Sequence, residues 1–140
     1  MSLPQQKPQA TALEHCLSEL KALLGDRIST ASDVRQLHGK DASFHEVHPP
    51  DAVAFVKSNE EVAEIVKSCV RHRIPIVPFG SGTSLEGHIA ALHGGISLDL
   101  SRMNQVLEVN ENDLDCWLQA GVTRKQLNGH LQISESVFSD

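Results

Sequence analysis

A glycine-rich loop carries the residues whose chemistry is clearest in this sequence. An apolar run from Ile74 to Phe79 predicts a short buried strand. Two glycines and three hydroxyl side chains follow it directly, in the order Gly80, Ser81, Gly82, Thr83 and Ser84. Glycines let a backbone curl close to a ligand, and successive N–H groups in such a turn can converge on an anion. The loop therefore predicts a site for a phosphate-bearing ligand, with a plain glycine turn between strands as the alternative.

Two common nucleotide-binding loops do not fit this segment. A dinucleotide-binding G-x-G-x-x-G loop would need a third glycine where the chain has Leu85. Residues 82–87 have the glycine spacing of a Walker loop, but His88 and Ile89 stand where Lys and Ser or Thr would follow. The cation that grips nucleotide phosphates is therefore missing from this position.

Three ordered motifs extend the pattern beyond the loop. They span Pro78–Gly87, Asp99–Asn104 and Gln119–Arg124. With them, residues 30–131 resemble the FAD-binding domain of the vanillyl-alcohol oxidase/p-cresol methylhydroxylase superfamily. The motifs are similar to those of FAD-linked D-lactate dehydrogenases of the cytochrome type and of the glycolate oxidase D subunit.

The resemblance implies FAD as the cofactor. By matching position, the residues that would wrap the FAD pyrophosphate are Gly80, Ser81, Gly82, Thr83 and Ser84. Pro78 would lie at the edge of the cofactor, and Gly121 would lie close to the flavin side. A small 2-hydroxy acid would be the substrate, and a cytochrome or a quinone-linked acceptor would take the electrons. No catalytic residue is expected in this chain, because the family carries its base and its substrate-binding groups in later segments.

The resemblance also predicts a division of the chain. We expect an N-terminal helical segment over residues 1–30, a partial FAD-binding domain over 31–131, and a divergent, truncated tail over 132–140. The chain would then be the FAD-binding portion of a D-lactate or glycolate dehydrogenase, inactive alone. The alternative is a non-catalytic module that binds a nucleotide or another protein.

Composition limits the possible partners. A chain of 140 residues with 40% hydrophobic and 21% charged residues suits one globular domain. The net charge of −6 argues against a nucleic-acid surface. No apolar run is long enough to cross a membrane, and residues 1–10 lack the pattern of a signal or transit peptide. We therefore expect a cytoplasmic protein, or a mitochondrial one if its source is eukaryotic.

Cysteines and histidines predict no further chemistry. The cysteines, expected as buried reduced thiols, are Cys16, Cys69 and Cys116. His45 and His48 are three residues apart, but the following Pro49-Pro50 prevents a helix that would present them together. We therefore expect no metal site.

The first half of the chain predicts the elements that position the loop. Leucine spacing indicates an amphipathic helix over residues 11–24, with a capping box of Thr11 and Glu14 and with Gly25 at its end. A short helix follows over 32–38. A strand at 52–56, a helix capped by Ser58 with Glu61, and the Ile74 strand then form a strand–helix–strand unit. Such a unit predicts parallel strands, with the loop at the carboxyl end of the second.

The second half shows a period-two alternation. Residues 96–100, 105–109 and 114–120 read as antiparallel or mixed strands, and a helix starts at Thr123 with Gln126 in its capping box. Trp117 is expected to pack on a neighbouring element, and Asp99 and Arg102 to belong to a structural turn. The predicted class is α+β, the N-terminal half of a p-cresol methylhydroxylase-type FAD-binding domain, with one mixed sheet and flanking helices.

Overall fold

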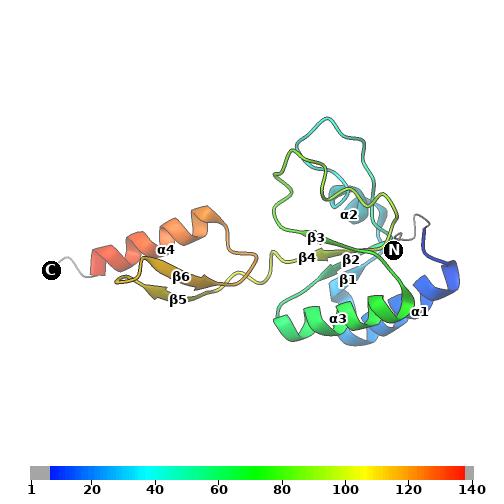
Figure 1. The fold of residues 1–140 in the computed structure, drawn as a ribbon, viewed down its shortest axis with the longest axis horizontal. Coiled ribbons are helices and arrows are strands. Elements are labelled where there is room, and N and C mark those ends of the chain that lie inside the picture. Colours follow the sequence, from blue (N-terminus) through cyan, green and yellow to red (C-terminus); the bar gives the residue numbers. More distant parts are fainter. Residues whose placement is uncertain (1–6, 138–140) are drawn as a thin grey trace.

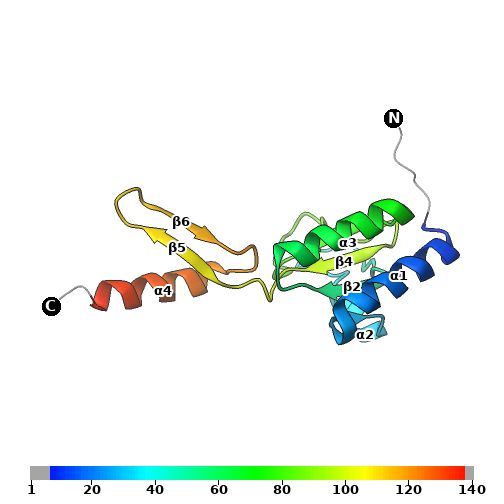
Figure 2. The same ribbon diagram turned by 90° about the horizontal axis from the view of Figure 1, so that it is seen from below.

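The chain forms two parts arranged along one long axis (Figure 1). The computed structural model describes residues 7–137. The larger part holds a four-stranded sheet with helices α1 (Ala10–Leu24), α2 (Ser32–Leu37) and α3 (Asn59–His72). The smaller part holds the hairpin of β5 (Val106–Asn110) and β6 (Asp115–Leu118) together with helix α4 (Arg124–Val137). Figure 2 shows the same separation from below.

The four-stranded sheet is mixed, as predicted. Its order is β1 (Ile28–Ser29), β2 (Ala52–Phe55), β4 (Ile96–Asp99), β3 (Ile76–Phe79). β1 runs antiparallel to β2, whereas β4 is parallel to both of its neighbours. The predicted strand–helix–strand unit therefore exists, but β4 is inserted between its two strands.

The alternation in β4 does not mark an exposed face. All four of its residues are buried, including Ser97 and Asp99. α1 and α3 cover one face of the sheet, while α2 and two long loops cover the other (Figure 1). A parallel strand that is covered on both faces has no side exposed to solvent. β4 therefore belongs to a mixed sheet, as expected, but the alternative of antiparallel pairing for this strand is wrong.

Helix α3 is positioned by its predicted cap. The Ser58 hydroxyl accepts a hydrogen bond from the Glu61 N–H at 3.3 Å, which satisfies one of the free amides at the helix start. The Glu61 carboxylate also accepts two hydrogen bonds from the Arg27 guanidinium, at 2.6 and 2.7 Å. This contact ties the start of α3 to the short 3-10 turn Gly25–Arg27 that follows α1.

Helix α1 starts differently from the prediction. Gln9 occupies the N-cap position and makes no side-chain cap hydrogen bond, so the expected box of Thr11 and Glu14 is wrong. Gly25 does end the helix, with φ +60 and an N–H that donates to the Lys21 carbonyl. The leucine stripe packs on α3 and the sheet, with Leu20 and Leu24 in the core.

The hairpin β5–β6 forms a sheet of its own instead of extending the larger one. Leu114 lies in its turn with φ +55 and is almost fully exposed. Trp117 pairs with Glu108 and is 66% exposed, so it does not pack on a neighbouring element as expected. The predicted box at the start of α4 is present, because Thr123 N and Oγ1 both donate to Gln126 Oε1 at 2.9 Å.

Cysteine burial follows the expectation in part. Cys16 and Cys69 are buried, Cys116 is half-buried, and all three thiols are free. No helix among residues 7–137 is long and apolar enough to cross a membrane.

Candidate cofactor-binding site

The glycine loop starts at the carboxyl end of the edge strand β3. Phe79 ends this strand, and its carbonyl accepts a hydrogen bond from Leu100 N at 3.0 Å. Leu100 directly follows β4, so the loop of residues 80–87 and the turn after β4 leave the sheet side by side. Ligands of open α/β sheets bind outside this edge.

The backbone of the loop is shaped by glycines. Gly82 has φ +67 and Gly87 has φ +69, a region that favours glycine. A Cβ on Gly82 would lie 3.0 Å from the Phe79 ring, so the loop backbone rests on that ring. A Cβ on Gly80 would meet no protein atom within 4 Å, so the space above Gly80 is open.

The loop offers free hydrogen-bond donors. In the described part of the chain, no protein group accepts from the backbone N–H groups of residues 80–85. The Ser81 and Thr83 hydroxyls lie 3.2 Å apart and form the one side-chain contact within this run. Exposed consecutive amides of this kind are the donors that a phosphate nest uses.

A second loop anchors the far end of the glycine loop. Asp41 accepts a hydrogen bond from Gly87 N at 2.9 Å, and it also accepts from the Ser43 hydroxyl and from Ser43 N. The hydroxyl of Ser43, followed by its N–H, lowers the pKa of Asp41 below the usual value. The carboxylate therefore stays ionised and ties residues 38–48 to the loop.

Gly121 joins the smaller part of the molecule to the same edge. Its N–H donates to the Met103 carbonyl at 2.8 Å. A Cβ at this position would lie 2.0 Å from the Leu100 carbonyl oxygen, so only glycine fits. Pro78 lies in β3, two residues before the loop, where a missing N–H is tolerated because the strand is at the edge of the sheet.

The structure thus brings the expected site residues to one edge of the sheet, Gly121 being linked to it through Leu100 and Met103. It also places there a pair that sequence reasoning missed. His38 Nε2 lies 2.8 Å from Asp99 Oδ2, and the two residues are 7% and 4% exposed. They are 61 positions apart in the chain. The only feature of the sequence that could have indicated their pairing is that each residue falls at the end of a predicted element.

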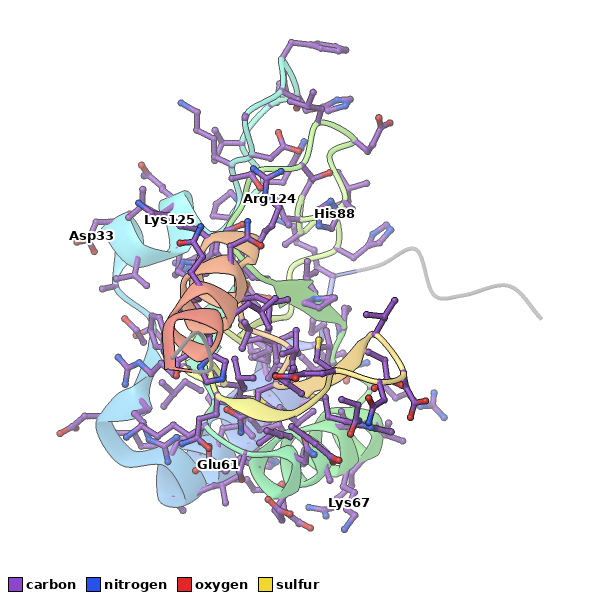
Figure 3. The ribbon with its side chains drawn as sticks, turned by 90° about the vertical axis from the view of Figure 1, so that its left-hand side faces the viewer. Asp33, Glu61, Lys67, His88, Arg124 and Lys125 are labelled. Carbon is purple, nitrogen blue, oxygen red and sulfur yellow. The ribbon has the colours of Figure 1, made fainter. Side chains whose placement is uncertain are left out.

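Among residues 7–137, no group of three or more His, Cys, Asp or Glu side chains could hold a metal ion. His88 lies among the loops, far from Glu61 and Lys67 in the layer of α1 and α3 (Figure 3).

Comparison with known proteins identifies the family. A family profile described as an FAD binding domain matches residues 50–139. The chain belongs to this family of FAD-binding domains. The predicted cofactor, FAD, is thereby confirmed. Residues 80–85 fit such a cofactor, because they offer free amides and hydroxyls for a pyrophosphate and carry no carboxylate.

Curated relatives agree with the resemblance. The chain is 43% identical over 125 residues to the probable mitochondrial D-lactate dehydrogenase of Danio rerio, covering 89% of this chain and 25% of that protein. It is 42% identical over 118 residues to the mitochondrial D-lactate dehydrogenase [cytochrome] of Arabidopsis thaliana, covering 83% and 21%. It is 40% identical over 88 residues to the glycolate oxidase subunit GlcD of Bacillus subtilis, covering 63% and 19%. The chain spans about a quarter or less of the length of these relatives.

Solved structures confirm the fold class. A crystal structure of p-cresol methylhydroxylase with substrate bound superposes with a TM-score of 0.83 at 26% identity, covering 91% of this chain and 26% of that one. The 4-ethylphenol oxidase of Gulosibacter chungangensis gives 0.82 at 25% identity, covering 93% and 27%. The fold is therefore the predicted p-cresol methylhydroxylase type.

Proposed function

We propose that the glycine loop holds the pyrophosphate of FAD in a flavin-dependent dehydrogenase of a small 2-hydroxy acid, D-lactate or glycolate. The contacts would be made by Gly80, Ser81, Gly82, Thr83 and Ser84. Pro78 would lie at the edge of the cofactor, and Gly121 would lie close to the flavin side. The observation that carries this proposal is the run of backbone N–H groups without a protein acceptor at the carboxyl edge of the sheet.

The chain's own residues would bind and orient the cofactor. FAD, when bound, supplies the two-electron redox chemistry. The free amides and the hydroxyls of the loop would donate hydrogen bonds to the pyrophosphate, and the Phe79 ring would support the loop backbone at Gly82. The Asp41 bond to Gly87 would hold the far end of the loop in place.

The substrate and the electron acceptor are proposed from the relatives. Those of Danio rerio and Arabidopsis thaliana are named as D-lactate dehydrogenases, and the second name includes cytochrome. We infer that a cytochrome or a quinone-linked acceptor receives the electrons. Both names include mitochondrial, and this supports a mitochondrial location if the source is eukaryotic and a cytoplasmic one otherwise.

Gly80→Val tests the loop assignment without disturbing the fold. A Cβ on Gly80 would meet no protein atom within 4 Å, and the φ of Gly80 is not in the positive region. Loss of affinity would therefore come from the ligand. Titration calorimetry with ADP, which contains the pyrophosphate, should show at least tenfold weaker binding, or about 1.4 kcal/mol.

Gly129→Val in α4 is the matched control, because a Cβ there also meets nothing within 4 Å. This variant should bind ADP as the wild type does. Equal ADP binding by the Gly80→Val variant and the wild type would refute the assignment of the loop to phosphate. Absence of ADP and FAD binding, with saturable binding to another protein, would favour the interaction module.

A further inference from the structure

His38 lies buried beneath the glycine loop with both ring nitrogens engaged. Nδ1 donates to the Val34 carbonyl at 2.8 Å, and Nε2 lies 2.8 Å from Asp99 Oδ2. Burial lowers the pKa of His38, but the hydrogen bonds to Asp99 and Val34 outweigh it, so the net pKa is raised. The Val34 carbonyl and an ionised Asp99 carboxylate are both acceptors, so the protonated ring donates from both nitrogens and its orientation is fixed from two sides.

The ring of His38 covers the last residues of three strands. Phe55, Asp99 and Phe79 occupy one register row at the carboxyl ends of β2, β4 and β3. The His38 ring lies 4.3 Å from the Phe79 ring and 5.7 Å from the Phe55 ring, measured between centroids. The ring therefore packs against the last residue before the glycine loop.

Phe79 transmits this contact to the loop. A Cβ on Gly82 would lie 3.0 Å from Phe79 Cζ and 3.3 Å from Cε2. The Phe79 ring thus lies close both to the His38 ring and to the backbone at Gly82. A different position of the Phe79 ring would require a different path of the loop.

An ion pair is not needed here for stability alone. Desolvation offsets much of the attraction in a buried pair, and apolar residues of similar volume often stabilise a fold as well. What the two hydrogen bonds of His38 add is a single orientation of its ring.

We propose that His38 is a positioning residue for the cofactor loop: anchored by Asp99 and Val34, its ring holds Phe79 against the backbone at Gly82. This inference rests on the proposed role of the loop in phosphate binding. His38 itself does not contact the cofactor; it acts through Phe79.

A double-mutant cycle on ADP affinity tests this role. The first change is His38→Phe together with Asp99→Asn, which keeps an aromatic ring at position 38, removes the anchor and leaves no unpaired buried carboxylate. The second change is Phe79→Leu. Each change should weaken ADP binding about tenfold, and their combination should weaken it little further, because both act through the same ring. In the ligand-free protein, the amide NMR signals of residues 80–84 should shift in both variants.

His72→Phe is the matched control. His72 is also paired with a carboxylate, because its Nε2 lies 3.0 Å from Glu19 Oε1, but His72 lies on α3, away from the glycine loop. This variant should bind ADP like the wild type. ADP affinity within twofold of wild type in the folded His38→Phe/Asp99→Asn protein, or fully multiplicative effects in the cycle, would overturn the positioning role.

Three further outcomes are decisive. If the paired variant does not fold, Asp99→Asn alone keeps the shape and should weaken ADP binding severalfold; unchanged affinity overturns the inference. Unchanged ADP binding in the Gly80→Val variant overturns the phosphate site and this inference together. Weakened binding in Gly80→Val with no effect of the His38 change overturns the positioning role alone.

Discussion

Gly121→Ala is expected to weaken the contact that holds the β5–β6 part of the molecule to the larger part. The added Cβ would lie 2.0 Å from the Leu100 carbonyl oxygen and 2.9 Å from the Met103 carbonyl oxygen. Real Cβ atoms essentially never come closer than 3.0 Å to such an atom, so the backbone must move by about 1 Å. That movement breaks the 2.8 Å hydrogen bond from Gly121 N to Met103 O.

The magnitude follows from these two effects. A lost hydrogen bond costs about 1 kcal/mol, and overpacking that shifts the backbone costs about 1–3 kcal/mol. The opening free energy of the hairpin part should therefore fall by about 2–4 kcal/mol, up to the full stability of that part. The sheet of the larger part should be affected much less, because its core lies on β2, β4 and the helices.

Native-state hydrogen exchange measures the two parts separately. Amides of residues 106–118 should exchange faster in the Gly121→Ala protein, while those of β4 should keep their protection. Gly129→Ala is the control with the opposite sign, because its Cβ meets nothing and alanine favours a helix by about 1 kcal/mol over glycine. Ordinary surface substitutions change stability by up to about 0.5 kcal/mol. If the opening free energy of the hairpin in Gly121→Ala stayed within about 0.5 kcal/mol of the wild-type value, the reasoning would be refuted.

Three other outcomes are expected. Ser58→Ala should lower the free energy of unfolding by about 1 kcal/mol in urea titrations, because it removes the acceptor of the Glu61 N–H; no change would contradict the cap. Arg27 side-chain hydrogen bonds lower the pKa of Glu61 below 4.5, so the stability they contribute is present above pH 4.5 and is lost as the pH falls through the lowered value. Despite burial, the bonds to Asp99 and Val34 raise the pKa of His38 above 6.5, so their stability is present below pH 6.5 and is lost as the pH rises through the raised value. Urea unfolding midpoints measured between pH 3 and 9 (roughly the span of these groups) should thus fall at both ends of this range. In His38→Gln, the fall at alkaline pH should be smaller; a fall equal to that of the wild type would exclude His38 as the cause of the alkaline loss of stability. The 140-residue chain should reduce no dye with D-lactate or glycolate, because it spans only about a quarter of its dehydrogenase relatives; turnover by a purified, FAD-loaded chain would contradict this.

Local signals in the sequence predicted most of the elements that carry the site. The Ser58–Glu61 cap, the Thr123–Gln126 box and the closing Gly25 each depend on residues within four positions of one another. The loop after β3 was visible for the same reason, because an apolar run followed by glycines and hydroxyls is a local pattern. The exception is the start of α1, where the helix begins at Ala10 and leaves Thr11 inside it.

Contacts between distant segments were beyond such reasoning. Nothing in the alternation of residues 96–100 indicated that α2 and the loops would cover the second face of β4, because coverage depends on the path of other segments. The pairing of His38 with Asp99 has the same origin. So does the approach of Cys16 and Cys69, whose sulfur atoms lie 3.9 Å apart although 53 positions separate them.

The sequence by itself determined the family and the presence of a glycine-rich loop after a strand. The expectation that this strand is buried was wrong, because β3 lies at the edge of the sheet and none of its residues is buried. Only the tertiary structure decided what supports the loop, because its neighbours come from α2, from β4 and from the 38–48 loop. It also decided why Gly121 is required, since the carbonyl that excludes a side chain there belongs to Leu100. Hydrogen bonds and steric contacts act over a few ångströms in space, and the chain positions they join become known only when the fold brings them together.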